Sequence, residues 1–217
     1  MPHTNTAVRV AGTWLAIASV LLVAALVLHG PLAPNLTDQM EKIADGATAW
    51  AVIHWVSAAA LSLYAVTGLV VLTSGSRLVG GWWTMTAWAV LTVSALWTMT
   101  TAVAEATVVT RAAVSGGKEM FEAWWAFAEG KATGIAFLAL AVAVISGNEA
   151  QSSERAVAAW SARIAMVSGL ASFAGWALGR WFGVDFGNLV WVASSVLMSA
   201  WTFWFGFALM RSRVNVI

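Results

Sequence analysis

Long apolar stretches, about six in number and separated by short polar segments, constrain this chain more than any other feature of its sequence. Each stretch approaches the ~20 residues that an α-helix needs to cross a ~30 Å hydrocarbon layer. Charged residues make up 10% of the chain, whereas a soluble domain carries about 25%. So few charges cannot supply a water-soluble surface, so the sequence predicts a polytopic membrane protein.

The predicted fold is all-α, a bundle of six transmembrane helices. The expected helices cover about residues 10–28, 49–73, 82–104, 123–146, 158–178 and 188–210. Glycine and proline turn signals lie between them. Because the spans use most of the chain, residues 1–217 are expected to form a single integral membrane domain with consecutive helices antiparallel.

The longest connection runs from Pro31 to about Thr48 and contains a second kind of helical signal. Leu36, Met40 and Ile43 share one helical face there, while the charged residues lie elsewhere. This pattern predicts a short amphipathic helix that lies on the outer membrane surface.

The distribution of basic residues indicates an orientation. Cytoplasmic loops carry an excess of Lys and Arg, so we expect both termini to be cytoplasmic in a multi-pass protein of a prokaryotic inner membrane. The net charge of +1 and the lack of a basic cluster argue against a nucleic-acid partner. With this orientation the cytoplasmic side receives Arg9, Arg77, Arg155, Arg163, Arg211 and Arg213, and the outer side receives Lys42, Arg111, Lys118, Lys131 and Arg180.

The chain is rich in tryptophan, with 15 residues. Most lie near the expected membrane borders, Trp50 among them, where amphipathic indole rings are favoured. Trp55, Trp88 and Trp97 are the ones expected to line the interior of the bundle.

Glycines at four-residue spacing predict close helix packing. Gly175, Gly179, Gly183 and Gly187 follow one another at this interval, and Gly130 and Gly134 repeat it earlier. Small residues let helix backbones approach closely within a bilayer. Contact between helices of this chain is favoured over a dimer seam, and a homo-oligomer stays open.

The candidate site residues are the polar side chains expected in the outer half of the bundle. Ionisable groups within a membrane are costly and mark functional sites. The candidates for binding a ligand or ion are His54, Thr98, Thr101, Glu105, Glu122, Glu129 and Lys131. Thr98, Thr101 and Glu105 share one face of their helix.

Three chemical roles stay open for these residues. His54, Glu105 and Glu129 together would offer a divalent metal one imidazole and two carboxylates. The same groups would also suit a proton relay. In a purely structural role, Glu129 would pair with Lys131 or Arg180, and His54 would donate to a carbonyl.

Several cofactors and activities find little support in the sequence. A bis-histidine haem needs two imidazoles at helix depth, and only His54 is expected well inside. Retinal needs a lysine in mid-helix, but Lys131 lies near the start of a helix. We find no catalytic motif. The leading hypothesis is therefore a non-catalytic subunit or accessory component of a larger membrane assembly. The alternative is a transporter or metal-binding membrane protein.

Overall fold

The computed structural model describes residues 6–211, so Arg213, used in the orientation argument, lies outside the described residues. The described chain is helical, as predicted. Its elements are α1 (Thr6–His29), α2 (Leu36–Asp45), α3 (Ala47–Leu72), η1 (Arg77–Val79), α4 (Trp82–Ala104), η2 (Glu105–Val109), α5 (Thr110–Val114), α6 (Lys118–Ala132), α7 (Gly134–Gln151), α8 (Ala159–Trp176), η3 (Ala177–Trp181) and α9 (Asp185–Arg211).

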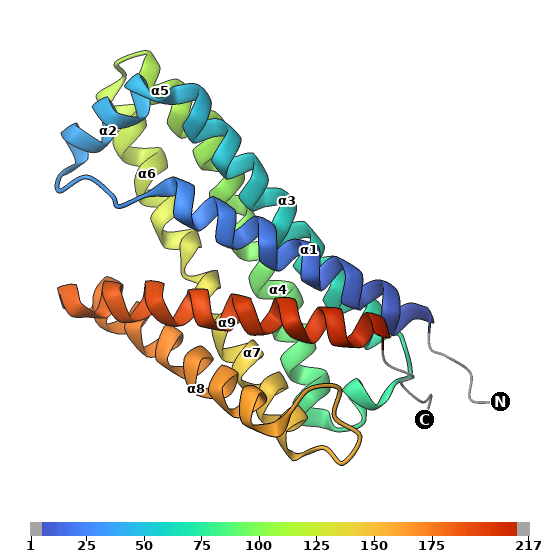
Figure 1. Cartoon of the computed structure of the whole chain (residues 1–217). Coiled ribbons are helices and arrows are strands. Elements are labelled where there is room, and N and C mark those ends of the chain that lie inside the picture. The colour runs from blue at the N-terminus through green and yellow to red at the C-terminus, as the bar shows by residue number, and fades with distance from the viewer. Residues whose placement is uncertain (1–5, 212–217) are drawn as a thin grey trace.

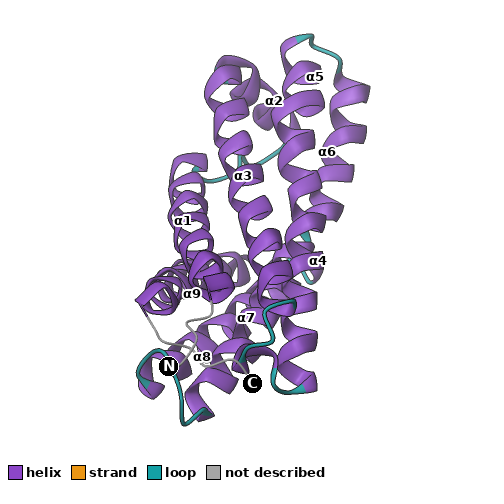
Figure 2. Cartoon of the chain, turned by 90° about the vertical axis from the view of Figure 1, so that its right-hand side faces the viewer, coloured by secondary structure: helices purple, strands orange, loops and turns teal. Residues whose placement is uncertain are grey.

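Six long apolar helical segments form a closed ring. Helices α1, α3, α4, α7, α8 and α9 each pack on the next, and α9 returns to α1. Figures 1 and 2 show this ring, with the beginning of α1 and the end of α9 together at one end. We call this the terminal end, and we call the opposite end, which carries α2 and α5, the α2 end. The chain is therefore a polytopic helical bundle with six candidate membrane spans.

The third and fourth spans are longer than the sequence pattern predicts. Residues Trp82–Val114 and Lys118–Gln151 run as nearly continuous helical segments of 33 and 34 residues. At 1.5 Å per residue, each is about 50 Å long, well beyond a ~30 Å hydrocarbon layer. The predicted loop over 105–122 is therefore mostly helix, and this hairpin extends the bundle at the α2 end (Figure 1).

The α2 end has a small hydrophobic core of its own. The predicted amphipathic helix is confirmed as α2, and Asn35 caps it by accepting a hydrogen bond from the Asp38 amide at 2.9 Å. This core explains why the helices continue past the expected membrane border. Its buried members are Ile43, Trp50, Val109, Ala112, Ala113, Phe121 and Trp125.

The expectation for the interior tryptophans was only partly right. Trp88 is buried, but Trp55 is 51% exposed and Trp97 is 36% exposed, so these two face outward. Trp50, expected at the membrane border, is buried instead, because α2 and α5 cover the first turns of α3.

Glycines lie at several helix crossings, although not all of the predicted ones do. A Cβ at Gly175 would lie 2.9 Å from the Gly187 carbonyl oxygen, and one at Gly179 would lie 2.9 Å from the Asn188 amide, so α8 and α9 approach closely there. A Cβ at Gly134 would lie 2.9 Å from the Ser94 carbonyl oxygen on α4. Gly130 and Gly183 have no such neighbour within 4 Å.

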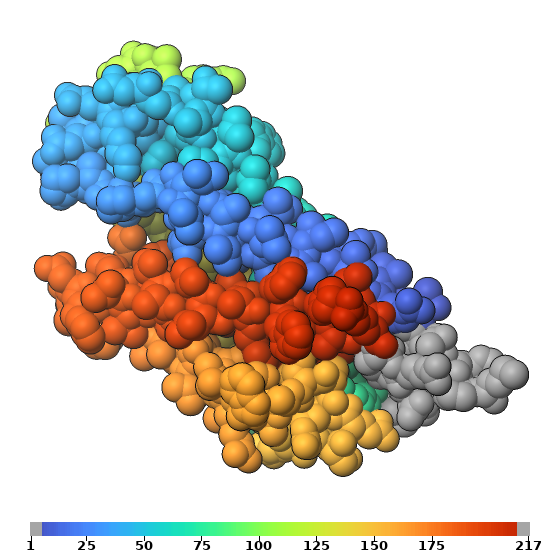
Figure 3. All heavy atoms as spheres, in the orientation of Figure 1, coloured from blue at the N-terminus to red at the C-terminus, as the bar shows by residue number. Residues whose placement is uncertain are grey.

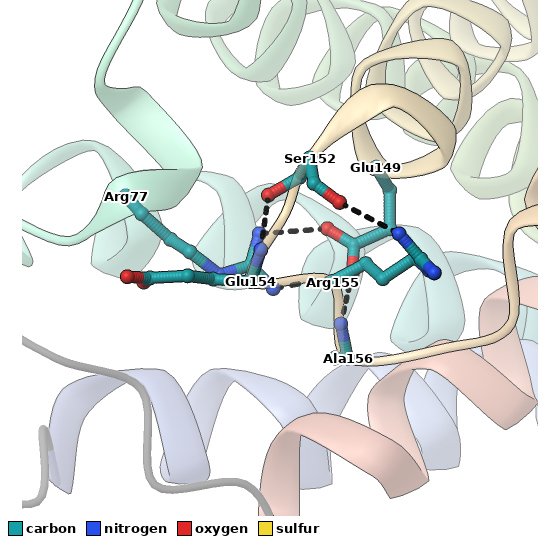
Figure 4. A network of polar contacts seen from close by, with 6 residues as sticks. All are labelled: Arg77, Glu149, Ser152, Glu154, Arg155 and Ala156. Atoms are coloured by element: carbon teal, nitrogen blue, oxygen red, sulfur yellow. Dashed lines mark hydrogen bonds and ion pairs between the residues drawn. The ribbon is translucent and has the colours of Figure 1, made fainter.

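An ion pair joins the α3–α4 connection to the last turn of α7 at the terminal end. Arg77 binds both carboxylate oxygens of Glu149, with Nη1 to Oε2 at 2.8 Å and Nη2 to Oε1 at 3.1 Å. The Ala156 amide also donates to this carboxylate (Figure 4). Since the Arg77 and Glu149 side chains are only 11% and 2% exposed, this pair and the Ala156 contact hold the α3–α4 connection, the end of α7 and the α7–α8 connection together away from water.

Candidate functional site

A buried carboxylate lies where the bilayer-length part of the bundle meets the core at the α2 end. Glu105 is 5% exposed, and its Oε2 accepts a hydrogen bond from the Trp50 indole at 3.1 Å. Among residues 6–211 no basic side chain lies within ion-pair distance of this carboxylate. The arrangement therefore gives a buried acidic group one neutral hydrogen-bond donor.

The backbone at Glu105 departs from a regular α-helix. Residues Glu105–Val109 form one turn of π-helix, η2, and the Thr110 hydroxyl donates to the Glu105 carbonyl oxygen at 2.7 Å. A π-turn inserted in an α-helix often marks a functional site. Here it carries the buried acid, and Thr110 supplies a hydrogen bond to its backbone carbonyl.

Two histidines lie beside Trp50. The ring centroids of His54 and His29 lie 4.7 Å and 4.6 Å from that of Trp50, and 5.2 Å from each other. His54 Nδ1 lies 2.8 Å from the Trp50 carbonyl oxygen. Because a carbonyl oxygen only accepts, Nδ1 carries the proton there. Trp50 therefore connects both imidazoles to Glu105, and we call His29, Trp50, His54 and Glu105 the outer cluster.

The end of α1 places His29 in this cluster. Gly30 follows with φ of +65°, a left-handed conformation that favours glycine, and it turns the chain out of the helix. The Gly30 carbonyl oxygen lies 2.8 Å from His29 Nδ1 and fixes the ring. The next residue, Pro31, accepts a hydrogen bond from Lys42 Nζ at 2.6 Å, which ties the loop to α2.

One member of the outer cluster is partly exposed at the α2 end. His29 is partly exposed, whereas His54 is only 7% exposed. In the space-filling view, α1 and α9 lie together near the terminal end and separate toward the α2 end, where α1 ends at His29 (Figure 3). The four side chains thus lead from a partly exposed imidazole to a buried carboxylate.

The predicted threonines lie near the cluster but make other contacts. The Thr101 hydroxyl donates to the Ala128 carbonyl oxygen at 2.9 Å and so ties α4 to α6. The Thr98 hydroxyl donates to Ser94 within its own helix and lies against Gly134.

The remaining predicted residues lie on α6, and among the described residues none of them makes a hydrogen bond or ion pair with the outer cluster. Glu129 is half exposed and pairs with Arg180 at 3.5 Å, one of the structural alternatives named from the sequence. Glu122 lies 3.9 Å from Lys118, and Lys131 lies over the Phe127 ring. No three or more His, Cys, Asp or Glu side chains within residues 6–211 are placed to hold a metal ion. The three residues predicted to share a metal are therefore not gathered together.

Sequence reasoning missed two members of the outer cluster. His29 lies beside the Gly30-Pro31 turn signal, so the sequence counts only His54 as an interior imidazole. The structure corrects this, because it brings the two rings together with their centroids 5.2 Å apart. The available signal for Trp50 was its position four residues before His54, which places both side chains on one face of the helix.

No protein family, curated protein or solved structure matches this chain.

The chemistry of the outer cluster therefore has to be deduced from its atoms. It combines a carboxylate, the face of an indole ring and two imidazole Nε2 atoms, and no hydrogen bond to either Nε2 is found among the described residues. A neutral imidazole with its proton on Nδ1 has a lone pair on Nε2. All of these groups attract positive charge, and the Lys42 ammonium already lies 5.9 Å from the centre of the Trp50 ring. The cluster is therefore suited to a cation.

Proposed function

We propose that this protein is a small membrane transporter that takes a cation from the α2 end of its bundle. The observation that carries the proposal is the Glu105 carboxylate, which is buried, lacks a basic ion-pair partner among the described residues and is hydrogen-bonded to Trp50, whose ring packs against two imidazoles. A lone charge in a low-dielectric site is costly. A bound cation would compensate it.

The depth of the cluster supports uptake from this end. About 20 residues of helix cross the hydrocarbon layer, so α4 would span it from Trp82 to about Thr101. Glu105 then lies just beyond the far border, within reach of water through His29. With both termini cytoplasmic, as the basic residues favour, the α2 end would face outward.

The test is cation uptake by the full-length protein reconstituted in lipid vesicles. Cu(I), Ag(I), Zn(II), Mn(II) and Na⁺ would be offered separately, and the ion captured per protein would be measured by mass spectrometry. We expect uptake of at least one ion above that of empty vesicles. Glu105→Gln should reduce it at least about tenfold, by analogy with the loss of a group supporting a metal ligand.

A matched control is Glu119→Gln, which removes an exposed carboxylate of α6 at the same end of the bundle. Its uptake should equal that of the unchanged protein, because a solvated surface charge contributes little. Uptake that is absent for every ion, or equally reduced in both variants, would contradict a transport role for the outer cluster.

A second candidate function, an accessory subunit, is favoured by a groove on the outside of the bundle. The groove has a volume of about 450 Å³ and lies between α4 and α7, with Val93, Trp97 and Phe137 in its wall. Small residues such as Ser94 also line it, and they permit close helix approach. A single helix of another membrane subunit is the occupant that this shape suits.

Filling the groove tests this second function. Val93→Trp should reduce recovery of a co-purifying subunit by about tenfold, a loss of about 1.4 kcal/mol in binding. Val167→Trp, at a similarly exposed position of α8 outside the groove, should leave recovery unchanged. A complex that both variants retain equally would place the partner elsewhere.

A further inference from the structure

The two imidazoles of the outer cluster are oriented as metal-binding histidines are. Nδ1 of His29 and of His54 each lies 2.8 Å from a backbone carbonyl oxygen, that of Gly30 and of Trp50 respectively. Metal-bound histidines almost always donate their second ring N–H to such a group, which fixes the tautomer and the direction of the ring. The unprotonated Nε2 atoms are therefore the available ligands.

The distance between the rings suits a site shared by both histidines. Their centroids are 5.2 Å apart, and the ring planes are inclined by 71°. Each Nε2 lies little more than 1 Å from its ring centroid and a metal–nitrogen bond is about 2 Å long, so an ion between the two Nε2 atoms needs the centroids about 6 Å apart. The rings would therefore turn and separate by about 1 Å to bind one ion. His29 comes from the end of α1 and His54 from the second turn of α3, so binding would join two helices of the ring.

The number of ligands limits the kind of ion. With no third His, Cys, Asp or Glu gathered at the site within residues 6–211, the protein offers two nitrogen atoms. Zinc sites in proteins usually have three or four protein ligands, and calcium and magnesium prefer several oxygen atoms. The monovalent d¹⁰ ions Cu(I) and Ag(I) are stable with two ligands, and imidazole is a suitable ligand for copper.

The surroundings also favour a single positive charge. Trp50 places its ring within 4.7 Å of both imidazoles, where an indole face attracts a cation. Its N–H holds the one buried carboxylate of the cluster, Glu105. The Lys42 ammonium already lies 5.9 Å from the centre of the Trp50 ring, so an ion with one positive charge meets less repulsion there than a divalent ion would.

We propose that His29 and His54 bind one soft monovalent ion, Cu(I) or Ag(I), through their Nε2 atoms. This names the class of cation for the transport function proposed above and rests on it. Trp50 contributes its ring face, and Glu105 provides the compensating charge without being a ligand. The ion keeps its oxidation state throughout, so the site needs no electron donor.

The test is Cu(I) binding by the full-length protein in detergent, without oxygen and in competition with bathocuproine disulfonate. Every variant is made in a His3→Ala background, so that His29 and His54 are the only histidines of the chain. We expect one Cu(I) per chain. His29→Ala and His54→Ala should each weaken binding by about 100-fold, and Glu105→Gln by about tenfold. X-ray absorption should report two nitrogen ligands.

A rescue variant separates loss of a ligand from loss of the fold. His54→Met replaces the imidazole with a thioether, which is also a good ligand for Cu(I), so it should bind Cu(I) far more tightly than His54→Ala. Size-exclusion chromatography confirms that the compared variants are folded. Binding that survives both alanine substitutions, or a thioether that rescues nothing, would overturn the proposed site.

The outcome also distinguishes this inference from the transport function. Absence of Cu(I) and Ag(I) binding, together with Glu105-dependent vesicle uptake of Zn(II) or Na⁺, would overturn the soft-ion site and leave transport standing. Absence of both binding and uptake would overturn the two proposals together.

Discussion

Two buried carboxylates at opposite ends of the bundle have very different surroundings. Glu149 at the terminal end is 2% exposed and binds both guanidinium nitrogens of Arg77 as well as a backbone amide (Figure 4). Glu105 at the α2 end is 5% exposed and has one indole N–H. Burial alone therefore does not indicate a functional acid. The difference lies in whether the protein itself neutralises the charge.

The backbone conformation also differs between the two buried carboxylates. Glu149 is in regular α-helix two residues before the end of α7, and its pair with Arg77 joins α7 to the α3–α4 connection. Glu105 begins a π-turn, and no hydrogen bond within residues 6–211 reaches Nε2 of His29 or His54, which pack against Trp50. Glu149 at the terminal end thus has its charge compensated by Arg77, whereas the α2 end has groups available to a ligand. The same substitution made at both acids tests this contrast directly.

The largest effect is expected from Glu149→Gln. This change removes the charge that compensates Arg77, which is itself 11% exposed. Breaking a buried ion pair on one side costs about 3 kcal/mol of unfolding free energy or more. Unfolding in mixed detergent micelles measures the loss. Removing the stranded charge as well, in Glu149→Gln/Arg77→Met, should recover much of it. A double variant no more stable than the single one would show that the pair is not the source of the loss.

The next largest effect on stability is expected from ion binding at the α2 end. A ligand that binds only the folded protein stabilises it by about 2.7 kcal/mol at 100 times its dissociation constant. We therefore expect Ag(I) to raise the free energy of unfolding by this amount in the unchanged protein and in Glu149→Gln. His54→Ala, which should bind about 100-fold more weakly, should gain only about 0.4 kcal/mol at the same Ag(I) concentration. Equal stabilisation of His54→Ala would mean that Ag(I) binds elsewhere.

Much of the fold could be predicted from local sequence, because membrane spans and amphipathic helices have strong patterns. The apolar stretches and the Leu36, Met40 and Ile43 face gave the six spans and α2. The helical continuation over 105–114 was missed, since Arg111 and the following Ser115-Gly116-Gly117 interrupt the apolar pattern. Only the packing of Val109 and Phe121 into the core at the α2 end shows why helix persists there.

The outer cluster was harder to predict because its members come from three distant segments. His54 and Glu105 stood out individually, as ionisable groups in apolar helices. His29 did not, because Gly30-Pro31 beside it is a strong turn signal. The position of the Glu129 side chain depends on its ion pair with Arg180, an exposed residue of another helical segment. Such pairings depend on how the helices pack together. The periodicity of a single helix carries no information about that packing.

A smaller effect is expected from Trp50→Phe, which keeps the aromatic ring but removes the N–H donor of Glu105. A hydrogen bond to a charged group contributes about 1.5 kcal/mol or more, so the variant should lose about this much unfolding free energy. Trp160→Phe, at a 68% exposed position, should lose almost none. If Glu105→Gln is introduced first, Trp50→Phe should cost less. An equal cost in both backgrounds would show that the indole does not support the carboxylate.

The smallest effect on stability, and the sharpest test of the contrast, is Glu105→Gln. Glutamine has nearly the same shape, and its carbonyl oxygen can still accept the Trp50 N–H, while the uncompensated charge disappears. Since no basic partner within residues 6–211 is left stranded, the free energy of unfolding should change by less than about 1 kcal/mol. The same substitution at Glu149 should cost about three times as much. Cation binding should respond in the opposite order, falling in Glu105→Gln and persisting in Glu149→Gln. If instead both substitutions destabilise the protein equally, Glu105 is a structural acid like Glu149, and its burial does not indicate a functional site.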